Sequence, residues 1–302
     1  MIIRGEIQLN DPVQTLLPEG AKLPEQDAQQ ITLIDLATHR SGLPRISLNL
    51  KDYDPTNPYV DYTAERLYEF LSTYELPRAI GEQFEYSNIG MGLLGHALAQ
   101  RAKTSYRDLV IERILVPLGM KDTRIALSPS MQTRLAQGHN GKAQPTPNWD
   151  FPMLAGAGAL RSTASDMLHF LKANLDGKIL AAALSQVRIE KSTAGTDMAI
   201  GLGWLINKKY EDKPILWHDG GTGGSCFFMG LDMESRRGVV VLTNGQCGVN
   251  DIGFHLLDIR YMLSQPEPLR FRTEIHVDPQ LLSRVTHVVF LVLVFESWIK
   301  TC

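Results

Sequence analysis

The residues after position 195 constrain the fold most, because the spacing of apolar residues changes there from helical to strand-like. Short apolar runs occupy residues 200–206, 215–217, 226–229 and 239–242, with turn-forming residues between them. Such runs predict successive antiparallel strands, with residues 232–238 as a polar hairpin connection. Residues 252–263 have the spacing of a helix and are expected to close this part of the chain.

Residues before position 195 have the spacing of helices instead. Thr32, with Asp35 three residues later, predicts a capping box and a short helix. Thr63 is expected to cap a second helix, and further helices are predicted from Ile89, from Tyr106 and from residues 162–166. A helical block followed by consecutive strands predicts an α+β fold (mixed α/β), in which helices flank an antiparallel sheet.

This pattern divides the chain into four parts. We expect residues 1–30 to form a connection to the sheet subdomain and residues 31–195 to form a mostly helical subdomain. Residues 196–270 are expected to form the antiparallel sheet with its closing helix, and residues 271–302 an atypical apolar tail. Within that tail, Val288 to Phe295 has high β-propensity and neither charge nor proline, which fits either a buried strand or a foreign segment that packs poorly.

Composition and charge exclude several classes of function. A formal net charge of -3 gives no reason to expect nucleic acid or an anionic membrane as a partner. The three cysteines, Cys226, Cys247 and Cys302, are too few and too widely spaced for a disulfide framework or a zinc site. We therefore expect neither metal nor cofactor. No apolar run approaches the roughly 20 residues that span a bilayer as a helix.

The first segment with chemical potential is Tyr86-Ser87-Asn88. A phenol can act as a general base if nearby cations lower its pKa from about 10, and an amide can both donate to and accept from a peptide-like substrate. The same three residues also fit the start of a helix that Ser87 or Asn88 caps.

The second segment is the polar, glycine-rich stretch from His218 to Gly224, which we expect at the junction between two strands. Glycine at such a place allows a ligand to approach the backbone, and the Gly221 N–H is a candidate half of an oxyanion hole. A glycine-rich turn without a binding role is the alternative interpretation.

In order and spacing, these segments resemble the class C β-lactamase family, which includes D-alanyl-D-alanine carboxypeptidases and related esterases. The resemblance is carried by Glu6 to Pro12, Leu36-Ala-Thr-His-Arg-Ser-Gly-Leu-Pro44, Tyr86-Ser-Asn88, Pro117-Leu-Gly-Met120 and Gly158 to Asp166. His218-Asp219-Gly220 stands where the lactamases carry Lys-Thr-Gly. The resemblance implies a β-lactamase/transpeptidase-like fold, with a cleft between its two parts, whose N-terminal strands are missing from this chain.

The resemblance also implies roles for single residues. Tyr86 would be the general acid or base, with His218 as a polar group beside it. Asn88, Gly220, Gly221 and Thr222 would contact substrate, a small molecule or peptide such as a β-lactam, a D-Ala-D-Ala peptide or an ester. The family is typically periplasmic or secreted, although the first residues here have no signal-peptide pattern.

The family's nucleophile, a Ser-x-x-Lys expected before Tyr86, is not found, and we expect the motif to be absent. The closest approach, Ser47 to Lys51, is one residue too long. Ser41, Ser87 and Ser225 are the substitutes to consider, with His39 and His218 as bases. Three functions remain open: an impaired serine hydrolase that forms an acyl-enzyme, a non-catalytic peptide- or ester-binding module, and an inactive gene fragment.

Missing strands would leave one edge of the sheet unpaired, and unpaired edges bind other strands. We expect either the apolar run from Val288 to Phe295 or a second copy of the chain, as a homo-oligomer, to cover that edge.

Overall fold

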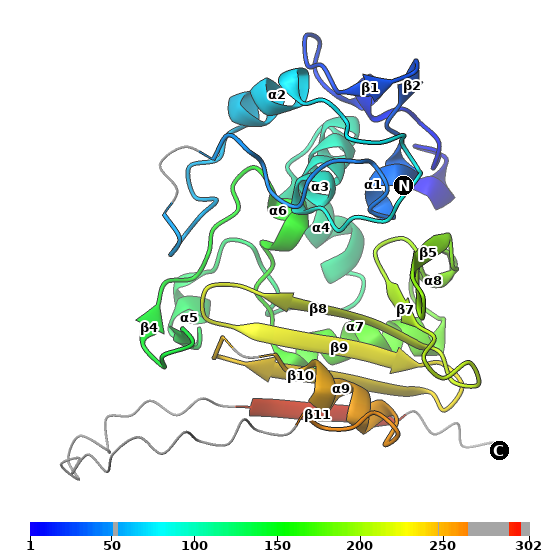
Figure 1. The fold of residues 1–302 in the computed structure, drawn as a ribbon. Helices are drawn as coiled ribbons and strands as arrows, with labels where there is room; N and C mark the ends of the chain where they lie inside the picture. Colours follow the sequence, from blue (N-terminus) through cyan, green and yellow to red (C-terminus); the bar gives the residue numbers. More distant parts are fainter. Residues whose placement is uncertain (51–53, 247, 265–289, 297–302) are drawn as a thin grey trace.

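The structure, a computed structural model, describes residues 1–50, 54–246, 248–264 and 290–296. It consists of a helical layer, with an irregular N-terminal segment, placed above a twisted sheet that has one helix on each face (Figure 1). The predicted mixture of helices and an antiparallel sheet is confirmed. The division into four parts remains a prediction.

The helical part follows the predicted caps closely. Thr32 and Asp35 form the capping box of α1, and the Thr63 side chain accepts the Arg66 N–H at the start of α2. The helices that precede the main sheet in the sequence are α1 (Leu33–Ala37), α2 (Ala64–Thr73), α3 (Asn88–Ala102), α4 (Tyr106–Val110) with a π-helical continuation (Ile111–Leu115), α5 (Pro129–Gln132), α6 (Ala155–Gly158), α7 (Ala164–Asp176) and α8 (Ala181–Arg188). Gly177 ends α7 in the left-handed conformation that the sequence predicts for a terminating glycine.

The main sheet is antiparallel throughout, in the order β11-β10-β9-β8-β7-β6-β5. Its strands are β5 (Ser192–Gly195), β6 (Met198–Ile200), β7 (Leu205–Asn207), β8 (Ile215–Gly221), β9 (Cys226–Asp232), β10 (Arg237–Thr243) and β11 (Phe290–Glu296). The run at 200–206 is not one strand, because Gly203 adopts a φ of 83° and turns the chain between β6 and β7. Helix α9 (Asn250–Leu257) is shorter than the 252–263 prediction at its C-terminal end.

Shorter elements complete the fold. Two small hairpins pair β1 (Glu25–Gln26) with β2 (Gln29–Gln30) and β3 (Gly138–His139) with β4 (Pro145–Thr146). Short 3-10 turns cover Ile2–Arg4 and Val13–Leu16. Neither these pieces nor β5 and α8 were predicted from the sequence, because none of them has a clear apolar run or a recognised cap.

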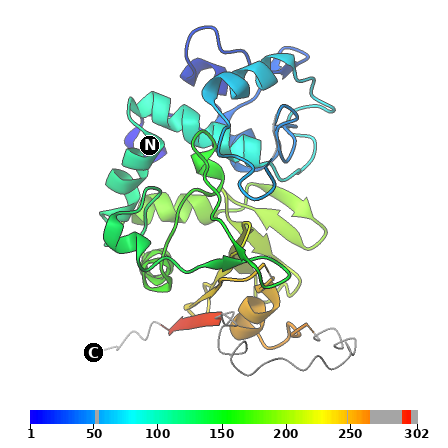
Figure 2. The same cartoon turned by 90° about the vertical axis from the view of Figure 1, so that its left-hand side faces the viewer.

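Strand β11 pairs with β10 along its whole length, from Arg237 opposite Glu296 to Thr243 opposite Phe290. Figure 2 shows it in red at the edge of the sheet farthest from the first helices. The prediction that the apolar run covers a sheet edge is therefore confirmed for residues 290–295. Val288, residue 289 and the rest of the 271–302 tail lie outside the described residues, and nothing in the described part supports a second copy at this edge.

Strand β10 is buried on both faces of the sheet, and its consecutive valines serve opposite faces. Val239 and Val241 pack with Phe254 of α9, whereas Val240 packs with Leu171 of α7. This alternation is the period-two geometry of a strand. Because burying each such side chain contributes roughly 1.5–3 kcal/mol, the two helices hold β8 to β10 firmly in place for the site at the end of β8.

Candidate functional site

Tyr86 lies two residues before α3, and the cap of that helix fixes its place. The Ser87 hydroxyl accepts the Gly90 N–H at 2.8 Å and donates to the Pro44 carbonyl at 2.7 Å. The prediction that Ser87 caps a helix is therefore confirmed. This capping role is compatible with a functional role for Tyr86, because the cap at Ser87 holds Tyr86 at the start of the helix.

Asn88 is the first residue of α3 and is partly buried. Its backbone N–H donates to the Arg45 carbonyl at 3.0 Å. The Arg45 guanidinium lies over the Tyr86 ring, 5.3 Å from its centroid. The loop after Pro44 therefore lines the same corner of the molecule as the start of α3.

His218 comes from β8, in the other half of the chain, and reaches the same place. The centroids of the Tyr86 and His218 rings are 6.4 Å apart. His218 Nδ1 lies 2.7 Å from the Asp219 carbonyl oxygen, which only accepts, so Nδ1 carries the proton and Nε2 keeps its lone pair. Burial lowers the pKa of His218, which keeps the ring neutral near pH 7.

A general base at Tyr86 would require nearby cations to lower the pKa of the phenol, and the structure does not meet this condition. Burial raises its pKa, the Asp219 carboxylate raises it further, and Arg45 acts in the opposite direction with a smaller effect. The phenol is therefore protonated near pH 7 and available as a hydrogen-bond donor or acid.

The stretch from His218 to Gly221 is strand, not a turn, which corrects the sequence-based interpretation. These four residues continue β8 and pair with β9 as far as Gly221 opposite Cys226. The turn comes afterwards, where the Thr222 N–H donates to the Ser225 carbonyl at 2.9 Å. Of the predicted substrate contacts, Gly220 and Gly221 thus lie at the end of the strand beside His218, and Thr222 begins the turn that follows.

Glycine is required at position 220 for a local packing reason. A Cβ there would lie 2.4 Å from Cε1 of Phe227 on the neighbouring strand. The Asp219 side chain accepts from the Asn250 amide at 2.7 Å, which fastens this end of β8 to α9. The strand end is therefore held in place before any ligand arrives.

None of the three serines considered as substitute nucleophiles has the surroundings of an activated serine. Ser41 and Ser87 are each 1% exposed, and their hydroxyls serve the backbone N–H groups of Leu43 and Gly90. Ser225 is partly exposed but sits in the β8–β9 turn, with no lysine three residues on. Neither Ser41 nor Ser87 has a hydroxyl that a substrate can reach.

The expectation that the chain holds no Ser-x-x-Lys is wrong as stated. The pattern occurs once, at Ser297-Trp298-Ile299-Lys300, after Tyr86 and His218 instead of before them. Those four residues lie outside the described residues. The ranges that the structure describes contain no such pattern.

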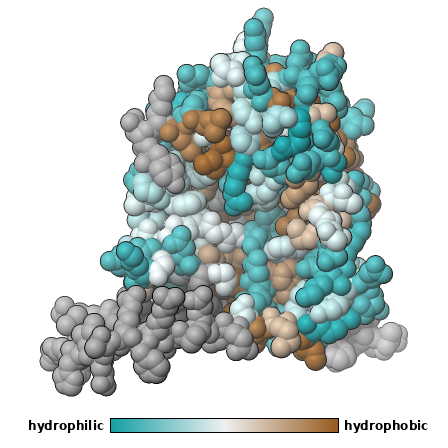
Figure 3. Space-filling view, in the orientation of Figure 1, coloured by the Kyte–Doolittle hydropathy of each residue, from teal (hydrophilic) through white to brown (hydrophobic). Residues whose placement is uncertain are grey.

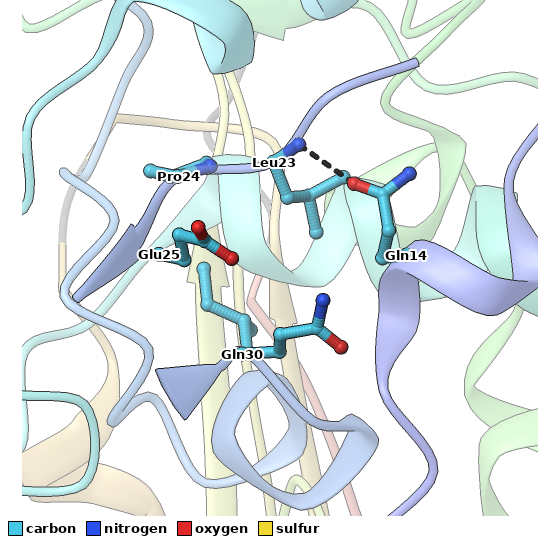
Figure 4. Close-up of a pocket in the computed structure, with 6 residues that line it drawn as sticks. Gln14, Leu23, Pro24, Glu25 and Gln30 are labelled. Atoms are coloured by element: carbon cyan, nitrogen blue, oxygen red, sulfur yellow. Dashed lines mark hydrogen bonds between the residues drawn. The ribbon is translucent and has the colours of Figure 1, made fainter. Parts of the chain in front are cut away.

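Two small cavities lie elsewhere. One, of about 20 Å³, is lined by residues of β1, β2 and the Val13–Leu16 turn, where Gln14 accepts the Leu23 N–H at 2.9 Å (Figure 4). The other, of about 150 Å³, lies beside α3, α4 and α6 and is lined by His96, Tyr106 and Gly156 among others. Neither cavity is lined by Tyr86, Asn88 or the end of β8.

On the face in Figure 3 hydrophilic residues predominate and hydrophobic ones form separate small groups. Within the described ranges, no three or more His, Cys, Asp or Glu side chains come together as metal ligands. Across the same ranges, none of the helices combines the length and hydrophobicity that crossing a bilayer requires.

Sequence reasoning missed two residues that shape the site and gave a third, His39, a different role as a candidate base. His39 packs against Tyr86, Arg45 lies over it, and Asn250 holds Asp219. His39 and Arg45 belong to, or directly follow, the segment Leu36–Pro44 that carries the family resemblance, which was the available signal. Nothing in the sequence marks Asn250, whose role depends on where α9 packs.

The fold and the paired motifs are those of a β-lactamase-related protein, and comparisons with known proteins agree. The sequence pattern that defines the Beta-lactamase family matches residues 2–253. The D-alanyl-D-alanine-carboxypeptidase/endopeptidase AmpH of Escherichia coli (strain K12) is 32% identical over 276 residues, covering 83% of this chain and 70% of that protein. The chain belongs to the Beta-lactamase family.

Other relatives and solved structures point the same way. Penicillin-binding protein 4 of Amycolatopsis lactamdurans is 25% identical over 264 residues, covering 81% of this chain and 68% of that protein. The β-lactamase/D-alanine carboxypeptidase of Yersinia pestis, solved with citrate, superimposes with a TM-score of 0.70 at 27% identity, covering 80% of this chain and 72% of that one. The class C β-lactamase of Rhodobacter sphaeroides gives 0.68 at 26% identity, covering 84% and 80%.

Proposed function

We propose that this chain recognises small amides and esters of the D-alanyl-D-alanine and β-lactam type between the start of α3 and the end of β8. One observation carries the proposal. Tyr86 and His218 come from distant parts of the sequence, and the centroids of their rings are 6.4 Å apart. The relatives named above act, by their names, as carboxypeptidase, endopeptidase, penicillin-binding protein or β-lactamase. Their substrates share a compact amide or lactam bond.

Each residue then has a task that its chemistry permits. The Asn88 amide pairs with the substrate amide, and the Gly221 N–H donates to the carbonyl oxygen, where negative charge develops during attack. The protonated Tyr86 phenol donates to the leaving group, and the free Nε2 of neutral His218 accepts a proton or hydrogen bond. Gly220 and Thr222 complete the wall along which the substrate lies.

Acylation requires more than these groups. In the family's route a serine oxygen attacks the carbonyl carbon, and a neighbouring base must take the serine's proton. The described ranges offer no serine with a lysine three residues on. We therefore propose that hydrolysis through an acyl-enzyme is impaired in this chain while ligand recognition is retained.

Covalent labelling and thermal stabilisation together test this proposal. After incubation with a fluorescent penicillin, we expect the intact mass to be unchanged. A non-hydrolysable D-Ala-D-Ala peptide analogue should nevertheless raise the melting temperature, because a ligand at 100 times its Kd stabilises by about 2.7 kcal/mol. The matched control is Tyr86→Phe, which should reduce the shift without unfolding the protein.

Each other outcome has a definite meaning. A mass increase by one penicillin would show a complete acylation machinery and refute the impairment, and peptide mapping would locate its serine. No shift with any ligand of the class would refute recognition and favour an inactive member of the family.

A further inference from the structure

We infer that His39 is a positioning residue for Tyr86, holding both the backbone that carries the phenol and the ring itself. This inference deepens the proposed function. Its claim about ligand affinity rests on the proposal that Tyr86 contacts a ligand. The sequence suggested His39 only as a base for a substitute serine, and the family comparisons assign it no task. Four features of its surroundings carry the argument.

The backbone of His39 is the first feature. His39 has a φ of 55°, in the left-handed region that non-glycine residues rarely adopt, and its side chain is 2% exposed. Its carbonyl accepts the Glu85 N–H at 2.7 Å. Strained backbone of this kind persists where the surroundings over-determine it, and such positions cluster at functional sites. Here the strain aims the ring at the residues that precede α3.

The ring nitrogen is the second feature. His39 Nδ1 accepts the Ser87 N–H at 3.1 Å, so this nitrogen is unprotonated and the proton is on Nε2. Together the carbonyl and Nδ1 of His39 bind the N–H groups on both sides of Tyr86. One residue therefore clamps the backbone on which the phenol is mounted.

Ring stacking is the third feature. The His39 and Tyr86 rings lie with centroids 4.3 Å apart and planes inclined by 31°. Phe84 packs its edge against the His39 ring at 5.7 Å and 84°, which prevents the imidazole from turning away. The imidazole therefore forms a fixed surface against which the phenol rests.

The charge state is the fourth feature. Burial, and then the nearby His218, lower the pKa of His39 to about 4. The ring is therefore neutral at any pH near 7, and the lone pair that accepts the Ser87 N–H is always present. A histidine that simply filled the core would not need to pair with the backbone on both sides of Tyr86 and with its ring.

Fluorine NMR on protein made with 3-fluorotyrosine tests the inference. The chain has nine tyrosines, and the resonance missing from Tyr86→Phe identifies Tyr86. The test variant is His39→Asn, because asparagine tolerates a positive φ and its side-chain oxygen can still accept the Ser87 N–H. We expect the Tyr86 resonance to move and narrow as the ring loses its support. Ligand affinity should fall roughly three- to tenfold, the value of one aromatic contact.

His96→Asn is the matched control. His96 is another histidine beside a tyrosine, partly buried, with Nε2 2.6 Å from the Tyr68 hydroxyl, but it lies within α3 away from β8. This variant should move the Tyr68 resonance and leave that of Tyr86 and the ligand affinity unchanged. If His39→Asn does not fold, a fluorine–proton Overhauser contact between Tyr86 and the His39 ring in the unmutated protein serves instead.

The outcomes separate this inference from the proposed function. A lower melting temperature of His39→Asn with an unmoved Tyr86 resonance would overturn the positioning role. Absence of the Overhauser contact would do the same. A moved resonance in a protein that binds no ligand of the class would support positioning and refute the proposed function.

Discussion

At the scale of single residues, the site contains two neutral histidines around a protonated phenol. Their protonation is set by burial: His39 and His218 have lowered pKa values, and Tyr86 has a raised one. The tautomers follow from backbone partners, since His39 accepts the Ser87 N–H and His218 donates to the Asp219 carbonyl. The charged side chains that act on the Tyr86 phenol are those of Asp219 and Arg45.

Stability should depend on pH through His39. Its pKa is about 4 in the folded protein and 6.5 in the unfolded chain, so the unfolded chain binds the proton more tightly. Lowering the pH from 7 to 5 should then reduce the free energy of unfolding by about 2 kcal/mol on account of this residue. Urea denaturation at both pH values measures this change. In His39→Asn, the free energy of unfolding should change between the two pH values by about 2 kcal/mol less than in the unmutated protein. An equal dependence in both proteins would contradict the assignment.

Ser87 should behave as a cap and not as a nucleophile. Ser87→Ala removes the acceptor for the Gly90 N–H at the start of α3 and should cost about 1–2 kcal/mol of stability. Chemical denaturation measures the cost. Any covalent labelling by penicillin that disappears in this variant, at full folding, would show that the serine reacts after all.

At the scale of elements, close backbone approach between helices depends on glycine. In α6, a Cβ on Gly156 would lie 2.5 Å from the Met91 carbonyl oxygen of α3, whereas one on Gly158 would meet only the Phe151 ring at 3.7 Å. Two glycines of the same short helix therefore have opposite tolerance for a side chain.

These two glycines form a matched pair of variants. Gly156→Ala should destabilise the protein by roughly 1–3 kcal/mol, because α6 must move away from α3. Gly158→Ala should be neutral or slightly stabilising, because alanine has the higher helix propensity. Melting temperatures of both variants check the packing, and equal effects would show that α3 and α6 are not in contact as described.

Caps and periodicity made most of the elements predictable. Thr32, Thr63 and Gly177 mark helix ends that the structure reproduces, and the apolar runs after position 195 mark strands. The extent of β8 was not predictable, because His218 to Gly221 has no apolar pattern and is strand only through pairing with β9. The partners of Tyr86 were equally hidden, since His39 reaches it through folding within the helical part and Asp219 only once the sheet packs against that part.

At the scale of the whole molecule, the sheet ends in β11, paired with β10 from residue 237 to residue 243. An edge strand without a partner exposes backbone groups that bind other chains. The apolar segment at residues 290–296 therefore has a structural use, which its composition alone did not establish.

A chain that ends at Ser264 should associate. Without β11, the edge of β10 is open, and we expect dimers or larger species in size-exclusion chromatography with light scattering. The full chain at the same concentration is the control. A truncated chain that stays monomeric and melts at the same temperature would show that β11 contributes nothing to the sheet.

The central claim is that the start of α3 and the end of β8 form one ligand site. A crystal structure with a bound D-Ala-D-Ala peptide analogue tests it most directly. The account predicts ligand density within hydrogen-bond reach of Asn88 and of the backbone at residues 220–222, beside Tyr86 and His218. Density elsewhere, for instance in the cavity beside His96, with none at this site would contradict it.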